Sequence, residues 1–174
     1  IFVHGALCMC VSGQCYMSSI FGERSGNRGL CAQPCRLPFT VQGGTGNDLS
    51  LKDLSLVEKA DEILSIGIDS LKIEGRMKRP EYVSAAVTSV RCALEGNLQQ
   101  ELTDKLRAVF SRSGFTQGYF ESKLGRDMFG IRQKEDVTAS TNKVLTDLSR
   151  AYEKETPLIP VEFCLTVVQG EKVS

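Results

Sequence analysis

The chain lacks net charge, a long apolar run and a second histidine. Its 21 basic residues balance 21 acidic residues, so the net charge is zero and no overall basic surface suited to nucleic acid is present. No apolar run reaches the roughly 20 residues that span a bilayer, and no signal-peptide pattern opens the sequence. We therefore expect a cytoplasmic protein with no membrane partner.

The single histidine limits the nucleophilic chemistry available to the chain. His4 lies in a strand-like segment, residues 1–7, and in an extended strand it stands roughly 13 Å from Cys8. That distance is too large for a thiolate–imidazole pair, and no base is identifiable for Ser18 or Ser19. The sequence therefore argues against a cysteine or serine protease, and His4 is predicted to be a packed or site-lining residue.

An initiating methionine is also missing. Strand-like segments stand near both ends, at residues 1–7 and 160–168. A strand needs a hydrogen-bonded neighbour, so we expect the chain to be a fragment of a longer protein. Its 174 residues, 41% of them hydrophobic, suffice for one ordinary globular core.

What the chain does have is cysteine, concentrated near its beginning. Five of the seven cysteines lie at positions 8, 10, 15, 31 and 35. In a reducing compartment, clustered cysteines hold metal more often than they form disulfides, and an odd total argues against a fully paired framework. The loop of residues 9–36 is rich in glycine, which lets the backbone fold closely around a bound group.

Two kinds of metal site fit these cysteines. Thiolates are soft ligands, and Cys8, Cys15, Cys31 and Cys35 suit an iron–sulfur cluster. The spacings from Cys10 to Cys15 and from Cys31 to Cys35 also fall within the range of structural zinc sites. Spacing alone leaves both interpretations open.

The rest of the sequence alternates strand-like and helix-like segments. Residues 49–53 and 68–73 have the apolar character of strands, whereas residues 54–66, 80–94 and 98–113 show helical spacing of apolar side chains. Successive strand–helix steps predict an α/β fold with a parallel sheet. We divide the chain into a partial (β/α) barrel with the cysteine cluster at 1–95, a helical and loop extension at 96–135, a linker at 136–156 and the start of a β-rich domain at 157–174.

Reactive residues follow the predicted strands. Cys8 follows the first strand, Lys52 and Asp53 end the second, and Glu74 and Arg76 follow the third. In a parallel sheet these ends share one edge, where barrels and doubly wound sheets place their chemistry.

The loop after the third predicted strand precedes a helix that starts at Pro80. Its cations, Arg76, Lys78 and Arg79, are candidates for gripping a carboxylate or phosphate beside the helix N-terminus. Glu74 is a candidate general acid or base, and pairing with Arg76 is the simpler alternative.

Six segments together resemble the collagenase-like peptidase family U32. The likeness covers roughly residues 1–130, and such a combination of motifs is highly specific. The segments are residues 2–8 (FVHGALC), 12–18 (SGQCYMS), 27–36 (NRGLCAQPCR), 49–54 (LSLKDL), 70–78 (SLKIEGRMK) and 114–120 (GFTQGYF).

The resemblance implies the C-terminal part of a TIM-like (β/α) barrel followed by the start of a β-rich domain. Better understood members of the family are oxygen-independent hydroxylases of RNA bases, with prephenate as the hydroxyl donor, or of ubiquinone precursors. In that branch four cysteines bind a 4Fe–4S cluster. They correspond here to Cys8, Cys15, Cys31 and Cys35, whereas Cys10 is unassigned.

The resemblance therefore implies an Fe–S-dependent hydroxylase of ribosomal or transfer RNA, with a small carboxylate as co-substrate. The Cys31 and Cys35 pair favours the RNA-modifying branch, and the long form is similar to the branch that makes 5-hydroxycytidine in 23S ribosomal RNA. We expect catalytic roles for Glu74, Arg76, Lys78 and Asp53, with Arg76 or Lys78 holding the carboxylate. The alternatives are a collagenase-like protease and a zinc-stabilised, non-catalytic RNA-binding scaffold.

Overall fold

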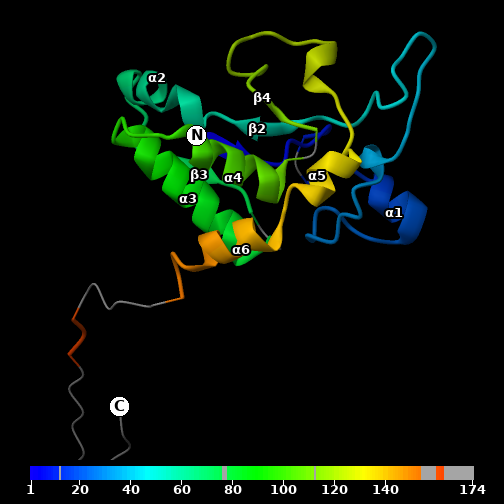
Figure 1. Ribbon diagram of the computed structural model, residues 1–174. Coiled ribbons are helices and arrows are strands. Elements are labelled where there is room, and N and C mark those ends of the chain that lie inside the picture. Colours follow the sequence, from blue (N-terminus) through cyan, green and yellow to red (C-terminus); the bar gives the residue numbers. More distant parts are fainter. Residues whose placement is uncertain (12, 76–77, 112, 154–159, 163–174) are drawn as a thin grey trace, which may run out of the picture.

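A four-stranded sheet with helices packed against it organises the fold (Figure 1). The computed structural model describes residues 1–11, 13–75, 78–111, 113–153 and 160–162. The strand order is β3-β1-β2-β4. The strands are β1 (Phe2–Gly5), β2 (Asp53–Ser55), β3 (Lys72–Ile73) and β4 (Phe115–Thr116).

The sheet is mixed, so the prediction of a parallel sheet was wrong. β1 pairs parallel with β3 but antiparallel with β2, with His4 opposite Ser55 and Gly5 opposite Leu54. β2 pairs parallel with β4. A parallel neighbour requires a crossover from one end of the sheet to the other. The cysteine loop leaves β1 and enters β2 at the same edge of the sheet, so β2 runs in the opposite direction.

Helices make up most of the remaining regular structure. The long helix α3 starts at Pro80, whose missing N–H is harmless at the first helical position, and it presents a buried stripe of small and apolar side chains. Against α3 pack α4, α2 and α6. The helices are α1 (Met17–Gly22), α2 (Ala60–Ser65), α3 (Pro80–Leu94), α4 (Gln100–Phe110), α5 (Lys134–Thr138) and α6 (Asn142–Ser149), with short 3₁₀ turns η1 (Pro34–Arg36), η2 (Val57–Lys59) and η3 (Arg126–Met128).

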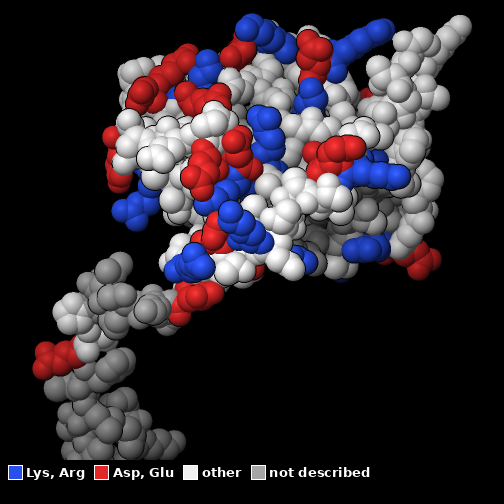
Figure 2. Space-filling view, in the orientation of Figure 1, with Lys and Arg blue, Asp and Glu red and all other residues white. Residues whose placement is uncertain are grey.

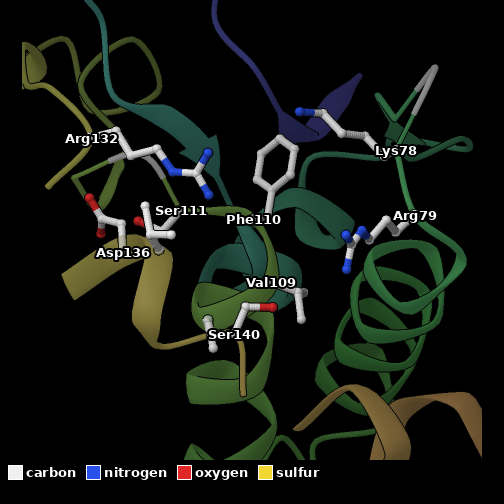
Figure 3. A pocket seen from close by; sticks show the side chains of 10 residues that line it. Lys78, Arg79, Val109, Phe110, Ser111, Arg132, Asp136 and Ser140 are labelled. Carbon is white, nitrogen blue, oxygen red and sulfur yellow. The ribbon is translucent and has the colours of Figure 1, made fainter. Parts of the chain in front are cut away.

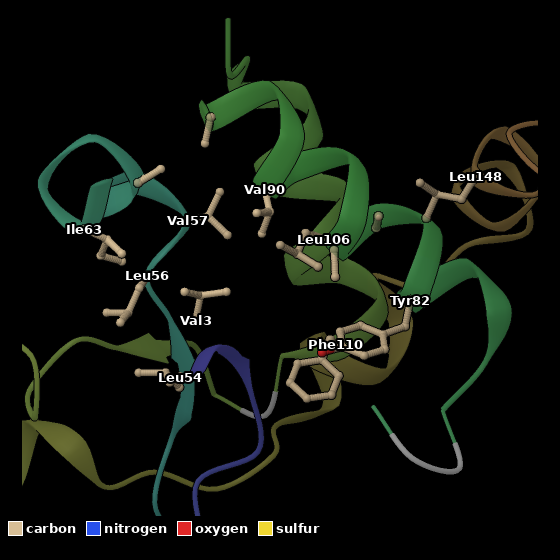
Figure 4. Packing of buried hydrophobic residues seen from close by; sticks show 14 residues of the cluster. Val3, Leu54, Leu56, Val57, Ile63, Tyr82, Val90, Leu106, Phe110 and Leu148 are labelled. Atoms are coloured by element: carbon tan, nitrogen blue, oxygen red, sulfur yellow. The ribbon is translucent and has the colours of Figure 1, made fainter. Parts of the chain in front are cut away.

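One hydrophobic core joins the sheet to the helices (Figure 4). Val3 of β1 and Leu54 of β2 meet Ile63 of α2, whereas Tyr82 of α3 stacks on Phe110 of α4 with ring centroids 4.2 Å apart. α6 closes this core through the buried Leu148, whose carbonyl accepts a hydrogen bond from Ser84 Oγ at 3.2 Å.

Several predicted elements were confirmed, whereas others begin at a different residue in the structure. The helix predicted at residues 80–94 is α3, and α4 lies inside the helix predicted at 98–113. The predicted helix at 54–66 begins only at Ala60, because residues 53–55 pair with β1 as strand β2. The four-part division of the chain stays a prediction, and most of the expected β-rich segment, residues 157–174, lies outside the described residues.

The surface carries both charges in alternation. Figure 2 shows acidic and basic side chains interspersed over the helices, as the zero net charge leads one to expect. The loop of residues 37–47, which projects beside the cysteine segment, holds no charged residue.

Candidate functional site

Two of the residues expected at one edge of the sheet, Glu74 and Asp53, lie there. Glu74 follows β3 and its backbone N–H donates to the His4 carbonyl at 2.8 Å, while Asp53 begins β2 beside the end of β1. The reasoning from the sequence placed Asp53 at a strand end. The structure places it at a strand start, and the antiparallel pairing of β2 brings it to the same edge.

Glycine at position 5 lets Glu74 approach the end of β1. A Cβ built on Gly5 would lie 2.6 Å from Glu74 Cβ, and the backbone φ of Gly5 is +144°. Any other residue would meet both the steric clash and an unfavourable conformation. The Glu74 carboxylate therefore lies directly beside the segment that leads to Cys8.

A cavity of about 510 Å³ opens at this edge. This volume is in the range of small-ligand pockets. Its lining includes a cysteine, a glutamate and a completely buried histidine together with apolar residues. The lining residues are Phe2, His4, Gly5, Ala6, Leu7, Cys8, Leu54 and Glu74.

Beneath the cavity lies a buried polar network. His4, Asp53 and Tyr82 are almost completely buried. The Tyr82 hydroxyl donates to the Glu74 carbonyl at 2.8 Å and lies 3.0 Å from His4 Nδ1. Burial raises the pKa of Tyr82, and the negative charges of Asp53 and Glu74 raise it further. Both carboxylates therefore act on the same hydroxyl group, which stays protonated.

Arg36 holds the two ends of the cysteine loop together. Its Nη2 donates to the Leu7 carbonyl at 2.7 Å, and its Nη1 donates to the Leu51 carbonyl and to Ser50 Oγ. Because Arg36 follows Cys35 and Leu7 precedes Cys8, this contact brings Cys8 and Cys35 to the same place.

Ser18 of α1 orders the middle of the same loop. The Ala32 N–H donates to Ser18 Oγ at 3.0 Å, and Ser18 Oγ lies 3.7 Å from Cys31 Sγ. The Gln33 N–H is 3.3 Å from the same sulfur. Donors directed at a sulfur stabilise a thiolate, and such contacts are typical of cysteines that ligate metal.

The other three cysteines predicted as ligands lie near enough to Cys35 to act on its thiol. Burial raises the pKa of the Cys35 thiol above its usual range; the Arg36 guanidinium lowers it, and negative charge on Cys8, Cys31 and Cys15 raises it. Cys10 is not among these neighbours and its side chain is exposed. The four cysteines are free thiols. Within the described part of the chain, no three His, Cys, Asp or Glu residues lie close enough to hold one metal ion.

The remaining predicted residues lie elsewhere. Lys78 lines a second cavity, of about 440 Å³, together with Arg79, Phe110, Arg132 and six other residues (Figure 3). Lys78 Nζ stands 4.8 Å from the centroid of the Phe110 ring, and His4 packs on the same ring with centroids 5.2 Å apart. Phe110 of the second cavity thus also packs on His4, a lining residue of the first cavity. Arg76 lies outside the described residues.

One residue of the second cavity escaped the sequence reasoning. Arg132, which extends into the second cavity in Figure 3, stands 53 positions after Arg79 in a segment with no motif, so no local pattern could associate the two. His4 was predicted to be a packed or site-lining residue, and the structure buries it completely beside the first cavity, with a hydrogen bond to Tyr82 that joins residues 78 positions apart.

Comparisons with known proteins show which family the chain resembles. Residues 1–129 match Peptidase family U32. The chain is 32% identical to a tRNA hydroxylation protein of Bacillus subtilis over 99% of its own length and 45% of that protein. It is 38% identical to a collagenase of Porphyromonas gingivalis, over 69% of the chain and 37% of the relative. It is 39% identical to a 23S rRNA 5-hydroxycytidine synthase of Escherichia coli, over 68% of the chain and 19% of the relative.

The chain thus spans less than half the length of each of these relatives. The comparison with solved structures found no match. Among the described helices, none is long and apolar enough to cross a membrane. The match over residues 1–129, together with identities above 30%, shows that the chain belongs to Peptidase family U32.

Proposed function

We propose that this chain is part of an iron–sulfur enzyme that hydroxylates a base of ribosomal or transfer RNA without oxygen, using prephenate as the hydroxyl donor. The observation that carries the proposal is the convergence of four cysteines beside a cavity that also holds Glu74. Two of the relatives are named for RNA hydroxylation, which supports the choice of substrate.

The cysteine donors fit a 4Fe–4S cluster. Cys8, Cys15, Cys31 and Cys35 would hold it, with Cys31 receiving hydrogen bonds at its sulfur. A single zinc ion requires four sulfurs at about 2.3 Å, packed tightly around one point. A 4Fe–4S cluster is likewise held by four cysteine thiolates, and the metal assay below decides between the two. When bound, the cluster would supply redox or Lewis-acid chemistry at the edge of the cavity.

The chain's own residues prepare the cavity for the reaction. Cys8 and Glu74 line the same cavity, so Glu74 is placed to take or give a proton beside the cluster. Asp53 is buried below and supplies negative charge that acts on Tyr82. Apolar side chains, including Phe2 and Leu54, form much of the remaining wall and exclude water from the reacting groups.

The second cavity suits the anionic co-substrate. Lys78, Arg79 and Arg132 bring three positive charges to its wall against one negative charge from Asp136. Asp136 Oδ2 already accepts the N–H groups of Gln133 and Ser113, at 2.8 and 2.9 Å. The excess of positive charge on this wall is suited to attract a carboxylate of prephenate.

A collagenase-like protease is the second candidate, because one relative carries that name. The described residues offer it little support, since His4, the only histidine of the chain, has Tyr82 as its hydrogen-bonding partner. A zinc-stabilised RNA-binding scaffold is the third, and it leaves the carboxylate in the cavity unexplained.

The test is anaerobic purification with assays for iron, sulfide and zinc. The proposal expects about four irons and four sulfides per chain, with a brown colour. RNA from cells that express the protein is then digested and searched for hydroxylated pyrimidines. Cys31→Ala should lose both iron and hydroxylation, whereas Cys10→Ala, the matched control, should keep both. One zinc without colour would contradict the proposal and favour the scaffold.

We also propose that the parallel pair of β1 and β3 belongs to a TIM-like barrel, in which the antiparallel β2 takes no part. Strand β3 has its outer edge unpaired among the described residues, and the relatives are more than twice as long as the chain. The missing strands of a longer protein would continue the sheet from β3. A structure of the longer protein in which no strand pairs with β3 would refute this arrangement.

A further inference from the structure

The outer face of helix α1 is apolar and exposed. Tyr16, Ile20 and Phe21 are 74%, 77% and 68% exposed. The Ile20 N–H donates to the Tyr16 carbonyl at 3.0 Å, so these two residues share one side of the helix, and Ser18 lies between them on the opposite side. Figure 1 shows α1 at the periphery of the molecule, away from the helices of the core. Neighbouring exposed apolar side chains of this kind mark a binding surface.

The opposite side of α1 rests on the cysteine segment. Ser18 is buried, and its Oγ accepts the Ala32 N–H at 3.0 Å and lies 3.7 Å from Cys31 Sγ. An α-helix with its side chains is roughly 10 Å across. The apolar face of α1 therefore stands about one helix width from the sulfur of a predicted cluster ligand.

The turn after α1 adds positive charge beside this face. Arg24 and Arg28 lie in that turn, and Glu23 is the only acidic residue in the sequence of residues 9–47. Arg24 Nε donates to the Leu30 carbonyl at 2.9 Å, which holds this arginine against the turn. Within the described part of the chain, neither guanidinium is paired with a carboxylate. Aromatic rings beside such arginines suit unpaired nucleotides, because bases stack on the rings and phosphates attract the guanidinium groups.

The position of α1 favours RNA over further protein as the occupant of this face. The strands of a longer protein would continue the sheet sideways, from the outer edge of β3. Helix α1 lies instead where β1 and β3 end, because the contacts of Arg36 with the Leu7 and Leu51 carbonyls return the cysteine loop to that edge. In (β/α) barrels this edge carries the active site and is the one that substrates approach.

We propose that α1 and the turn after it bind the unpaired nucleotides that flank the target base, with Tyr16 and Phe21 stacking on bases and Arg28 contacting a phosphate. The inference rests on the proposed function, because it takes the ligand to be the RNA that is hydroxylated. Enzymes that act on a flipped base also contact the nucleotides on either side of it. This surface selects unpaired segments of RNA, since a base inside a helix has no face free for stacking.

Fluorescence anisotropy with the purified, metal-containing protein tests the proposal. The probe is a labelled, unpaired pyrimidine-rich RNA of about ten nucleotides, and a duplex of the same sequence serves for comparison. Tyr16→Ala and Phe21→Ala should each weaken binding of the unpaired RNA roughly tenfold, the effect of one lost base stack. Tyr16→Phe and Phe21→Tyr, which keep an aromatic ring, should bind like the wild type. Arg28→Gln should reduce the slope of log Kd against log salt by about 0.7, the value for one phosphate of a single strand.

Tyr119 provides the matched control. It is 55% exposed and follows β4. Because β4 runs parallel to β2, and β2 runs antiparallel to β1, β4 ends at the opposite edge of the sheet from β1. Tyr119→Ala removes an exposed aromatic ring far from the proposed surface, and it should bind the unpaired RNA like the wild type.

Four results would overturn the role of α1. They are unchanged binding in Tyr16→Ala and Phe21→Ala, an equal loss in Tyr119→Ala, a duplex bound as tightly as the unpaired RNA, and a dimer that Ile20→Lys dissociates in sedimentation. A Tm lowered by several degrees in Tyr16→Ala would also overturn it, because the tyrosine would then be covered by protein.

The same measurements distinguish this inference from the function on which it rests. A protein that hydroxylates RNA but gives any of these contrary results would leave the proposed function standing and refute the role of α1. Ring-dependent binding of unpaired RNA by a protein that contains no iron and hydroxylates no RNA would support the α1 surface and refute the proposed function.

Discussion

The burial of His4 predicts a loss of stability in mildly acidic solution. Burial lowers the pKa of His4 from 6.5 to about 4. As the pH falls below 6.5, the unfolded chain takes up a proton on His4, whereas the folded protein does not until about pH 4. The unfolded state therefore binds more protons across this window, and the free energy of unfolding falls as the pH falls.

The size of the effect follows from the two pKa values. Each unit of difference is worth about 1.4 kcal/mol, so the full shift corresponds to about 3 kcal/mol. Between pH 7.5 and 5, where few carboxylates titrate, His4 alone should remove about 2 kcal/mol. This is a large share of the stability of an ordinary domain, about 5–15 kcal/mol.

Urea unfolding of the reduced, metal-free chain at several pH values measures this loss. His4→Phe retains an aromatic ring among Tyr82, Phe110 and Phe115 but cannot titrate. The loss of unfolding free energy between pH 7.5 and 5 should be about 2 kcal/mol smaller in His4→Phe than in the wild type. Parallel pH profiles for the two proteins, or an NMR titration of His4 with a midpoint near 6.5, would refute the reasoning.

Three other changes probe the cysteine loop, the strand end and the second cavity. Arg36→Gln should lower the iron content after reconstitution, since it releases the Leu7 carbonyl, whereas Arg28→Gln should bind iron like wild type; equal iron in both would show that the clamp is dispensable. In thermal melts, Gly5→Ala should destabilise the protein more than Gly96→Ala does. Both glycines have a positive φ, but only a Cβ at Gly5 would clash with a neighbour. The Gly96 change should therefore cost only the conformational penalty, roughly 1 kcal/mol. Arg132→Gln should raise the KM for prephenate and leave iron content unaltered, and an unaltered KM would remove the second cavity from the reaction.

Local chemistry made much of the fold predictable. Pro80 marked the start of α3, and the apolar spacing that follows it marked the buried face. The direction of β2 was not predictable in this way, because the strand-like pattern of residues 49–53 is the same for parallel and antiparallel pairing. The direction depends on where the cysteine loop returns, and that is set by contacts such as Arg36 with Leu7.

In the candidate site, too, some features were predictable from the local sequence and others depended on long-range contacts. Glu74 and Cys8 were placed at one edge from the order of strands, and the structure brings both to one cavity. Lys78 was expected beside them, yet it lines another cavity, because its side chain extends over Phe110. No sequence pattern predicts the contact between Lys78 and the Phe110 ring, because Phe110 belongs to a different helix, α4.

The clamp between Arg36 and the Leu7 carbonyl also bears on how this segment can change in evolution. It pins the base of the loop that contains all four predicted ligands. The entropy of closing a loop grows only with the logarithm of its length, so doubling the loop costs about 0.6 kcal/mol, less than a typical net hydrogen bond. Insertions between Cys15 and Cys31 are therefore cheap as long as both anchors remain. We therefore expect related proteins to differ in the spacing between these two cysteines. An arginine directly after the last cysteine should identify the four-cysteine site better than the spacing does.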